Sequence, residues 1–290
     1  MSKDSKIEWT DDTHQFVSGC GDASPGCANC YAKRQAYRMA SNPNAKVQQR
    51  YRGLTVLRGN GPQWTGEVRP LPEQLAVPLS QKKPRTIFVN SLSDTFHDDI
   101  PDEFIAAMFG VMAAAQQHIH QVLTKRAERM RRWFEWLSKH PTLRTVGALA
   151  DQAAFVGSIR DTTGALNRVT TNPPAWPLPN VHLGVSVENK KHGVPRIEHL
   201  RNTPAAVRFL SVEPLLEDLG ELDLTGIHWV IAGSESGPKA RPMEEDWVRS
   251  IRDQCIAAKV PFFYKQRLDE KRRKVSLPVL DGRQWAEVPR

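Results

Sequence analysis

The sequence has 290 residues, of which 40% are hydrophobic and 25% are charged. This length and balance are typical of a globular chain with a sizeable core, and they exclude a disordered protein. No apolar run approaches the ~18 residues that cross a bilayer, and the first residues contain no apolar signal core. We therefore expect a cytoplasmic protein with no membrane partner.

The charge of the chain is strongly positive. Its 40 Lys and Arg residues exceed its 32 Asp and Glu residues, which gives a formal net charge of +8. Part of the excess lies in two basic clusters, at 126–132 and 267–274. A charge of this size favours a polyanionic partner such as nucleic acid, and it is equally typical of solvated basic surfaces that keep a protein soluble.

In chain order, the first predicted strand is 14–18, and it leads directly into a cysteine-rich loop. Cys20, Cys27 and Cys30 lie within eleven residues, and a Pro-Gly turn between them folds the segment back on itself. Strong helix formers predict a helix over 31–40. The three sulfurs can therefore converge on one metal centre, since clustered cysteines in a reducing compartment indicate metal ligands rather than disulfides.

Further along, a region at 41–70 is predicted to be irregular and 72–79 to form a short helix. Compact apolar runs, typical of buried parallel strands, then alternate with helical segments. The predicted strands are 86–90, 119–123, 181–187, 207–212, 228–232 and 260–264, and the predicted helices are 101–117, 127–139, 195–201 and 244–258. With the first strand this makes roughly seven parallel strands, which predicts an α/β fold with a partial or near-closed (β/α) barrel.

We assign residues 1–267 to a single barrel domain and residues 268–290 to a basic C-terminal tail. The segment 141–180 interrupts the alternation and contains two Pro-rich stretches. A long connection of this kind in a compact domain is usually functional or mobile. We interpret it as an insertion that serves as a lid or a substrate-contact loop.

Polar side chains follow nearly every predicted strand. Because the active site of a parallel barrel is built from the loops after its strands, we expect these residues to surround one pocket. They are Ser91, Ser93, Asp94, His97, Thr124, Lys125, Ser186, Glu188, Asn189, Ser211, Glu213, Ser234, Glu235, Lys265 and Gln266. The alternative interpretation is that individual members only pair with one another around the mouth of the barrel.

Seven segments carry a resemblance to known proteins. They are Lys6-Ile-Glu-Trp-Thr10, Ser24-Pro-Gly-Cys-Ala-Asn-Cys-Tyr-Ala32, Phe88-Val-Asn-Ser-Leu-Ser-Asp-Thr-Phe-His97, Val122-Leu-Thr-Lys-Arg126, Leu183-Gly-Val-Ser-Val-Glu-Asn189, Phe209-Leu-Ser-Val-Glu-Pro-Leu215 and Gly233-Ser-Glu-Ser-Gly237. Over most of 5–267 the chain resembles the phage three-Cys-motif protein family, which is largely uncharacterised. The order of strand, cysteine loop and helix also resembles the radical S-adenosylmethionine (radical SAM) enzymes. The six residues between Cys20 and Cys27 depart from the usual Cys-x3-Cys-x2-Cys spacing of those enzymes.

The resemblance implies that Cys20, Cys27 and Cys30 bind a [4Fe–4S] cluster whose open iron holds SAM. It implies reductive cleavage of SAM to a 5′-deoxyadenosyl radical, with a reductant protein as partner. The substrate is unknown, and the basic charge and the phage-type family point to a nucleic acid or a nucleotide. We assign cofactor binding to Ser91, Ser93, Asp94, Thr124, Ser186, Ser234 and Glu235. We assign catalysis to Lys125, Glu188, Glu213 and Lys265.

Two alternatives involve no radical chemistry. In the first, the three cysteines and His14 form a Cys₃His zinc site that supports a basic nucleic-acid-binding module. In the second, the barrel only binds protein partners. The fourth cysteine, Cys255, falls on the apolar stripe of the predicted helix 244–258, so we interpret it as a structural residue.

Overall fold

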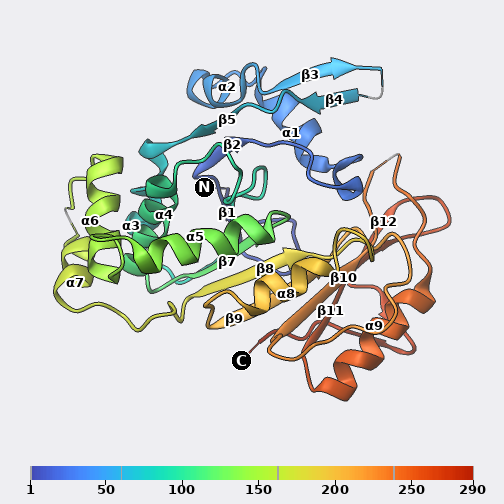
Figure 1. The fold of residues 1–290 in the computed structure, drawn as a ribbon. Helices are drawn as coiled ribbons and strands as arrows, with labels where there is room; N and C mark the ends of the chain where they lie inside the picture. Colours follow the sequence, from blue (N-terminus) through green and yellow to red (C-terminus); the bar gives the residue numbers. More distant parts are fainter. Residues whose placement is uncertain (1, 60, 162, 238, 290) are drawn as a thin grey trace.

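A computed structural model of the chain describes residues 2–59, 61–161, 163–237 and 239–289. Its central sheet contains, in spatial order, β1 (Asp12–His14), β6 (Thr86–Val89), β7 (Ile119–Thr124), β8 (Val181–Ser186), β9 (Val207–Val212), β10 (Trp229–Gly233), β11 (Phe262–Leu268) and β12 (Lys274–Ser276). Neighbouring strands from β1 to β11 are parallel, and β12 is antiparallel to β11. The sheet curls into a half-barrel (Figure 1). The predicted α/β class and the series of parallel strands are confirmed, and the barrel is partial.

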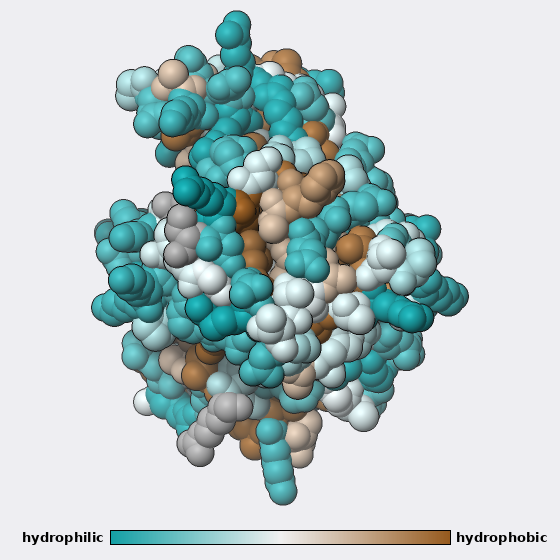
Figure 2. Space-filling model, turned by 90° about the vertical axis from the view of Figure 1, so that its left-hand side faces the viewer, coloured by the Kyte–Doolittle hydropathy of each residue, from teal (hydrophilic) through white to brown (hydrophobic). Residues whose placement is uncertain are grey.

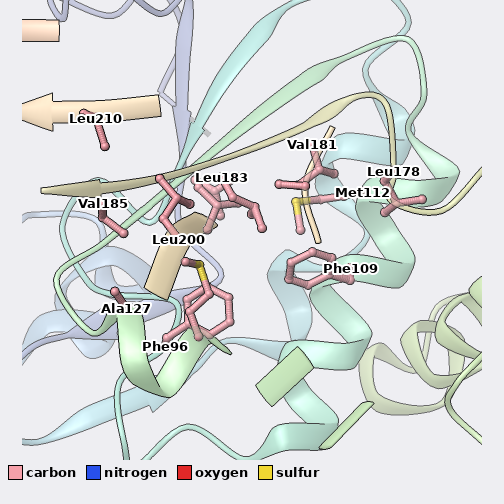
Figure 3. Packing of buried hydrophobic residues seen from close by; sticks show 14 of the residues in the cluster. Phe96, Phe109, Met112, Ala127, Leu178, Val181, Leu183, Val185, Leu200 and Leu210 are labelled. Atoms are coloured by element: carbon pink, nitrogen blue, oxygen red, sulfur yellow. The ribbon is translucent and has the colours of Figure 1, made fainter. Parts of the chain in front are cut away.

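The outer face of the sheet is covered by helices that follow the strands in the chain. They are α4 (Asp102–Ala114), α5 (Ala127–Lys139), α8 (Pro195–Arg201) and α9 (Glu245–Ala258). Strand β8 is buried at all its positions, as its continuous apolar run predicted. Its side chains Leu183 and Val185 meet Phe109 and Met112 of α4 in one hydrophobic core (Figure 3).

Helix α4 is apolar around its whole circumference because it is covered on two sides. The helices α6 (Val146–Gly157) and α7 (Ala165–Thr171) of the inserted segment pack against it. A Cβ atom at Gly110 of α4 would collide with the carbonyl group of Leu149 on α6. The close approach of these two helices therefore requires glycine at this position.

The inner face of the half-barrel contains an aromatic cluster. Trp9, Phe88, Phe209, Trp229 and Phe263 are all buried and pack together. The ring centroids of Trp9 and Phe88 lie 4.7 Å apart. The segment before β1 thus fills the concave side of the sheet, beneath the carboxyl ends of its strands.

The region 41–70 is not irregular, and that prediction is wrong. It contains α2 (Ala45–Tyr51), β3 (Thr55–Arg58), β4 (Gly61–Trp64) and β5 (Val68–Pro70), and together with α1 (Tyr31–Met39) it lies at one end of the molecule (Figure 1). Its structure depends on contacts that composition does not reveal. Strand β5 pairs with the distant β2 (Val17–Gly19), and Asn44 caps α2 by accepting hydrogen bonds from the backbone of that helix.

The predicted strand 14–18 is divided between β1 and β2. The break lies where Asn90, just after β6, accepts hydrogen bonds from the backbone N–H groups of Phe16 and Val17 at 2.8 and 3.1 Å. Asn90 has a positive φ of 56°, which asparagine tolerates better than most residues. These bonds turn the chain out of the main sheet and towards the cysteine loop.

The segment 268–290 was assigned to a tail, and its described residues, 268–289, fold back on the barrel. It contributes β12 and a short hairpin of β13 (Val279–Leu280) and β14 (Arg283–Gln284). No helix among the described residues is both long enough and apolar enough to cross a membrane. The face shown in Figure 2 is mainly hydrophilic, with small separate hydrophobic areas.

Two buried histidines lead us to expect acid sensitivity. His14 and His120 have no exposed surface, and burial lowers the pKa of each to about 3. A histidine in the unfolded chain has a pKa of about 6.5. Below that pH the unfolded chain binds more protons than the folded chain, so the stability of the folded chain falls as the pH falls. Between pH 7 and pH 5 we expect a loss of about 2 kcal/mol for each histidine.

The free energy of unfolding in urea at these two pH values measures the effect. His120→Leu removes one titrating group, so its acid-induced loss is expected to be about 2 kcal/mol smaller than that of the natural chain. An equal pH dependence in the two proteins would contradict the assignment of acid sensitivity to this residue.

Candidate functional site

The three clustered cysteines are arranged by a tight turn between β2 and α1. Cys20 follows β2, and a 3₁₀ turn at Pro25–Cys27 brings the chain around. The N–H of Cys27 donates to the carbonyl oxygen of Ser24 at 2.9 Å, and the N–H of Cys30 donates to that of Cys27 at 3.2 Å. Cys30 then occupies the N-cap position of α1, without a capping hydrogen bond from its side chain. The predicted strand-to-helix loop is confirmed, and we call residues 20–30 the cysteine loop.

All three cysteines line one cavity of about 210 Å³ at the carboxyl ends of the strands. Of the strand-end residues assigned from the sequence to cofactor binding or catalysis, ten also line it. They are Ser91, Ser93, Asp94, Thr124, Lys125, Ser186, Glu213, Ser234, Glu235 and Lys265. Ser211 and Gln266, which were also expected at the pocket, line it as well. His97, Glu188 and Asn189 are not among the lining residues, so the expectation of one ringed pocket is wrong for these three.

Glu188 lies behind the cysteine loop and is completely buried. Ser24 of the loop donates a short hydrogen bond to one carboxylate oxygen. Arg196 donates to the other oxygen at 2.6 Å, and the ammonium group of Lys125 lies 3.6 Å from it. Burial alone raises the pKa of Glu188, but Lys125 and Arg196 outweigh burial and hold the pKa below its usual value. Glu188 is thus a buried anion that anchors the loop.

Asp94 anchors the same loop from a second strand end. Its carboxylate accepts hydrogen bonds from the Thr124 hydroxyl at 2.7 Å, the Lys125 N–H at 3.1 Å and the Arg126 guanidinium at 3.1 Å. Arg126 in turn donates to the carbonyl oxygen of Gly21 at 3.2 Å. Much of the hydrogen-bonding capacity of Asp94 and Thr124 is therefore used in positioning Arg126 against the cysteine loop.

Glu235 provides a third anchor, after β10. Asn29 of the loop donates to its carboxylate at 2.9 Å, and Arg241 donates to it from both backbone and side chain. Burial raises the pKa of Glu235, but the bonds from Arg241 and Asn29 together hold it below its usual value. The side chain of Asn29 thus holds the cysteine loop against Glu235.

The serines after β6 also support the loop. Gln15 donates to the Ser91 hydroxyl at 2.8 Å, and the hydroxyl group of Tyr31 donates to the Ser91 carbonyl at 2.7 Å. The Ser93 hydroxyl donates to the carbonyl oxygen of Val17 at 2.9 Å. These two serines line the cavity and at the same time fix the strands on either side of it.

Glu213 and Lys265 form the ion pair on the opposite part of the cavity wall. Their charged groups lie 3.1 Å apart, and the Ser211 hydroxyl donates to Glu213 at 3.3 Å. The side chains are only 12% and 16% exposed. Unlike the three anchors, these two side chains make no described hydrogen bond to the cysteine loop and bond to one another instead.

Several cavity residues received no role from the sequence. Trp9, Phe88 and Leu123 line the cavity from the inner face of the sheet, and Arg126 lines it from a strand end. Trp9 and Phe88 lie in two of the segments that carry the family resemblance, and that position was the signal by which the sequence could have identified them. Among the described residues of 141–180 none lines the cavity, so the structure does not support a lid or substrate-contact loop there.

The ionisation of the thiols and the positions of the neighbouring side chains indicate which metal centre the cysteine loop could hold. Burial raises the pKa of Cys20 to about 12 and also raises the pKa of Cys30, so a cationic metal is needed to hold thiolates here. Within the described ranges no three His, Cys, Asp or Glu side chains are arranged to hold a single ion. His14 does not line the cavity; its Nε2 lies 3.0 Å from the carbonyl oxygen of Gln74.

The fold and the site together define a class of protein, an α/β half-barrel with a three-cysteine loop at the mouth of a cavity. A sequence model of the family described as "Protein of unknown function (DUF5131)" matches residues 4–289. The chain belongs to this family. No curated protein and no solved structure matches it.

Proposed function

We propose that this chain is a radical SAM enzyme of the phage three-Cys-motif type, which acts on a nucleic acid or a nucleotide. One observation carries the proposal: Cys20, Cys27 and Cys30 share the wall of a cavity with the polar ends of the strands. In the enzymes that the chain resembles, a cluster and SAM occupy this place in a partial barrel.

The arrangement of the thiols among the described residues does not match a ready site for a single zinc ion. Four ligands at about 2.3 Å from one zinc ion must lie close together, and no such group of three occurs in the described part of the chain. A [4Fe–4S] cluster takes each cysteine on a different iron, so its ligands lie further apart. The separate position of His14 also removes the fourth ligand of the zinc alternative.

When bound, the cluster supplies one electron, received from a reductant protein, that breaks the bond between sulfur and C5′ of SAM and leads to hydrogen abstraction from the substrate. The residues of the chain would bind the cluster and SAM and orient them. The thiols of Cys20, Cys27 and Cys30 would hold the cluster, and the anchors at Asp94, Glu188 and Glu235 fix the loop. Lys265 lines the cavity as the ion-pair partner of Glu213.

Anaerobic reconstitution with iron, sulfide and a chemical reductant tests the proposal. We expect iron and sulfide in the ratio of a [4Fe–4S] cluster, and 5′-deoxyadenosine after SAM is added, measured by liquid chromatography and mass spectrometry. One equivalent of zinc without iron, or an iron-loaded protein that never forms 5′-deoxyadenosine, would refute it.

A further inference from the structure

The positive charge of the chain is concentrated in one segment. Residues 31–70 contain eight Lys or Arg residues and a single acidic residue, so the segment has a formal charge of +7, compared with +8 for the whole chain. Its helices α1 and α2 and the hairpin of β3 and β4 pack around a small core that includes Ala36, Tyr51 and Leu54. These elements lie together at one end of the molecule (Figure 1), so the charge is gathered at that end.

Most of the cations in this segment are not neutralised. Lys33, Arg50 and Arg69 each pair with a carboxylate, and the other five form no ion pair with a described residue. We call these five the basic surface; they are Arg34, Arg38, Lys46, Arg52 and Arg58. Arg34 is half-buried and the other four are exposed. An anion can therefore approach them without displacing a carboxylate of the chain.

The two basic clusters at 126–132 and 267–274 differ from this surface. They contain nine cations, and seven of these pair with carboxylates. The other two are Lys271 and Arg272, and Arg272 donates to the carbonyl oxygen of Ala240. The clusters that stand out in the sequence are thus largely neutralised, and the charge available to a polyanion lies on the basic surface.

A row of side chains on α1 connects the basic surface with the cavity. Tyr31 lines the cavity and is 38% exposed. Arg34 and Arg38 follow at the next two turns, and side chains three or four positions apart are neighbours on a helix, with about 5–6 Å between their Cβ atoms. Arg34 also donates to the carbonyl oxygen of Ser236 at 3.5 Å, and Ser236 lines the cavity. The basic surface therefore begins at the cavity wall and extends away from it.

The cations inside the cavity are already paired. Lys125, Arg126 and Lys265 line it, and each pairs with a carboxylate. A phosphate group held wholly inside would therefore meet no unpaired cation among the described residues. The unpaired cations belong to α1, to α2 with the residue that follows it, and to β3. Only a ligand with several phosphates can contact these elements together while part of it occupies the cavity.

We propose that the basic surface binds the phosphate backbone of a single-stranded nucleic acid whose reactive nucleotide enters the cavity. The backbone carries one negative charge for each nucleotide, which suits cations spread over several elements. Tyr37 of α1 is 41% exposed and lies three residues after Arg34. An exposed aromatic ring among cations provides a stacking surface for an unpaired base. This inference rests on the proposed function in that it names the substrate class of the same site.

Fluorescence anisotropy with a labelled oligodeoxythymidylate of about 20 nucleotides tests the proposal, since such surfaces cover about 4–16 nucleotides. The natural chain should bind with an affinity that falls steeply with salt. The variant Arg38→Gln/Lys46→Gln/Arg52→Gln/Arg58→Gln changes only exposed side chains, so it should fold. At about 0.1 M salt we expect its affinity to be at least about tenfold lower. The slope of log affinity against log salt should be smaller by about 3, because each phosphate contact with a single strand contributes about 0.7.

The variant Arg131→Gln/Arg132→Gln/Lys271→Gln/Arg273→Gln is the matched control. It removes the same charge from the two basic clusters, and distant charges are largely screened at about 0.1 M salt. Its affinity should stay within about threefold of that of the natural chain. Equal losses in the two fourfold variants would overturn the proposal, and so would the absence of binding by the natural chain at low salt.

Tyr37→Ala separates base stacking from charge. It should lower the affinity by about fivefold to a hundredfold and leave the salt dependence unchanged, because it removes a ring and no cation. An unchanged affinity would overturn the assignment of a stacked base. Polyglutamate serves as the competitor: if it displaces the oligonucleotide as well as unlabelled oligonucleotide does, the surface fits an acidic protein and the proposal fails.

The same titration with Cys20→Ala separates this inference from the proposed function, because the variant lacks a cluster thiol and keeps the whole basic surface. Oligonucleotide binding by this variant and by the natural chain, when no sample forms 5′-deoxyadenosine, refutes the radical chemistry alone. Formation of 5′-deoxyadenosine by a natural chain that does not bind the oligonucleotide refutes the basic surface alone.

Discussion

Alanine at Cys20, Cys27 or Cys30, introduced one at a time, is expected to abolish the bound iron and the visible absorbance of the anaerobically purified protein. Each substitution leaves two thiol ligands on the loop where the cluster needs three. Iron and sulfide assays and visible spectra measure the effect. Formation of 5′-deoxyadenosine from SAM should disappear in the same three variants.

Cys255→Ala is the matched control for this series. Cys255 is completely buried in the core, and it does not line the cavity. Burial raises the pKa of its thiol to about 12. The variant should keep its iron and its absorbance. Loss of iron here would show that Cys255 is a ligand, and retention of the cluster in any of the other three variants would remove that cysteine from the ligand set.

Glu188→Ala is expected to lower the free energy of unfolding by about 3–5 kcal/mol, since it leaves buried positive charge without its counter-ion. Arg196 is 8% exposed, and its guanidinium group pairs with the buried Glu188 carboxylate at 2.6 Å. Ser24 of the cysteine loop loses its acceptor at the same time. We therefore expect less iron to be retained in addition to the loss of stability. Urea unfolding and iron analysis measure the two effects.

Glu198→Ala is the control for Glu188→Ala. Glu198 also pairs with an arginine, Arg201, but its side chain is 63% exposed, and exposed pairs contribute about 0–1 kcal/mol. We expect a small loss of stability and unchanged iron content. Similar losses in the two glutamate variants would contradict the anchoring role of Glu188.

Sequence reasoning found the parallel strands and the cysteine loop because both depend on local patterns. Continuous apolar runs such as 181–187 predict buried strands whatever surrounds them, and the spacing from Cys20 to Cys30 is a property of one short segment. The region 41–70 was misjudged because β2 and β5 form a pair through residues that are distant in the chain. The separation of β2 from β1 and the cap on α2 likewise depend on hydrogen bonds that composition does not show.

The sequence by itself determined the α/β class, the position of the three cysteines after the first strands and the polar character of the strand ends. Only the tertiary structure decided what those polar residues do. Asn29 and Glu235 are 206 positions apart, and Ser24 and Glu188 are 164 apart, so no local pattern reveals that they meet. Curling of the sheet brings these side chains onto one loop, and it places Trp9 beneath the cavity. Four carboxylates at strand ends were predicted to contact ligands. Three of them serve instead to hold the cysteine loop in place.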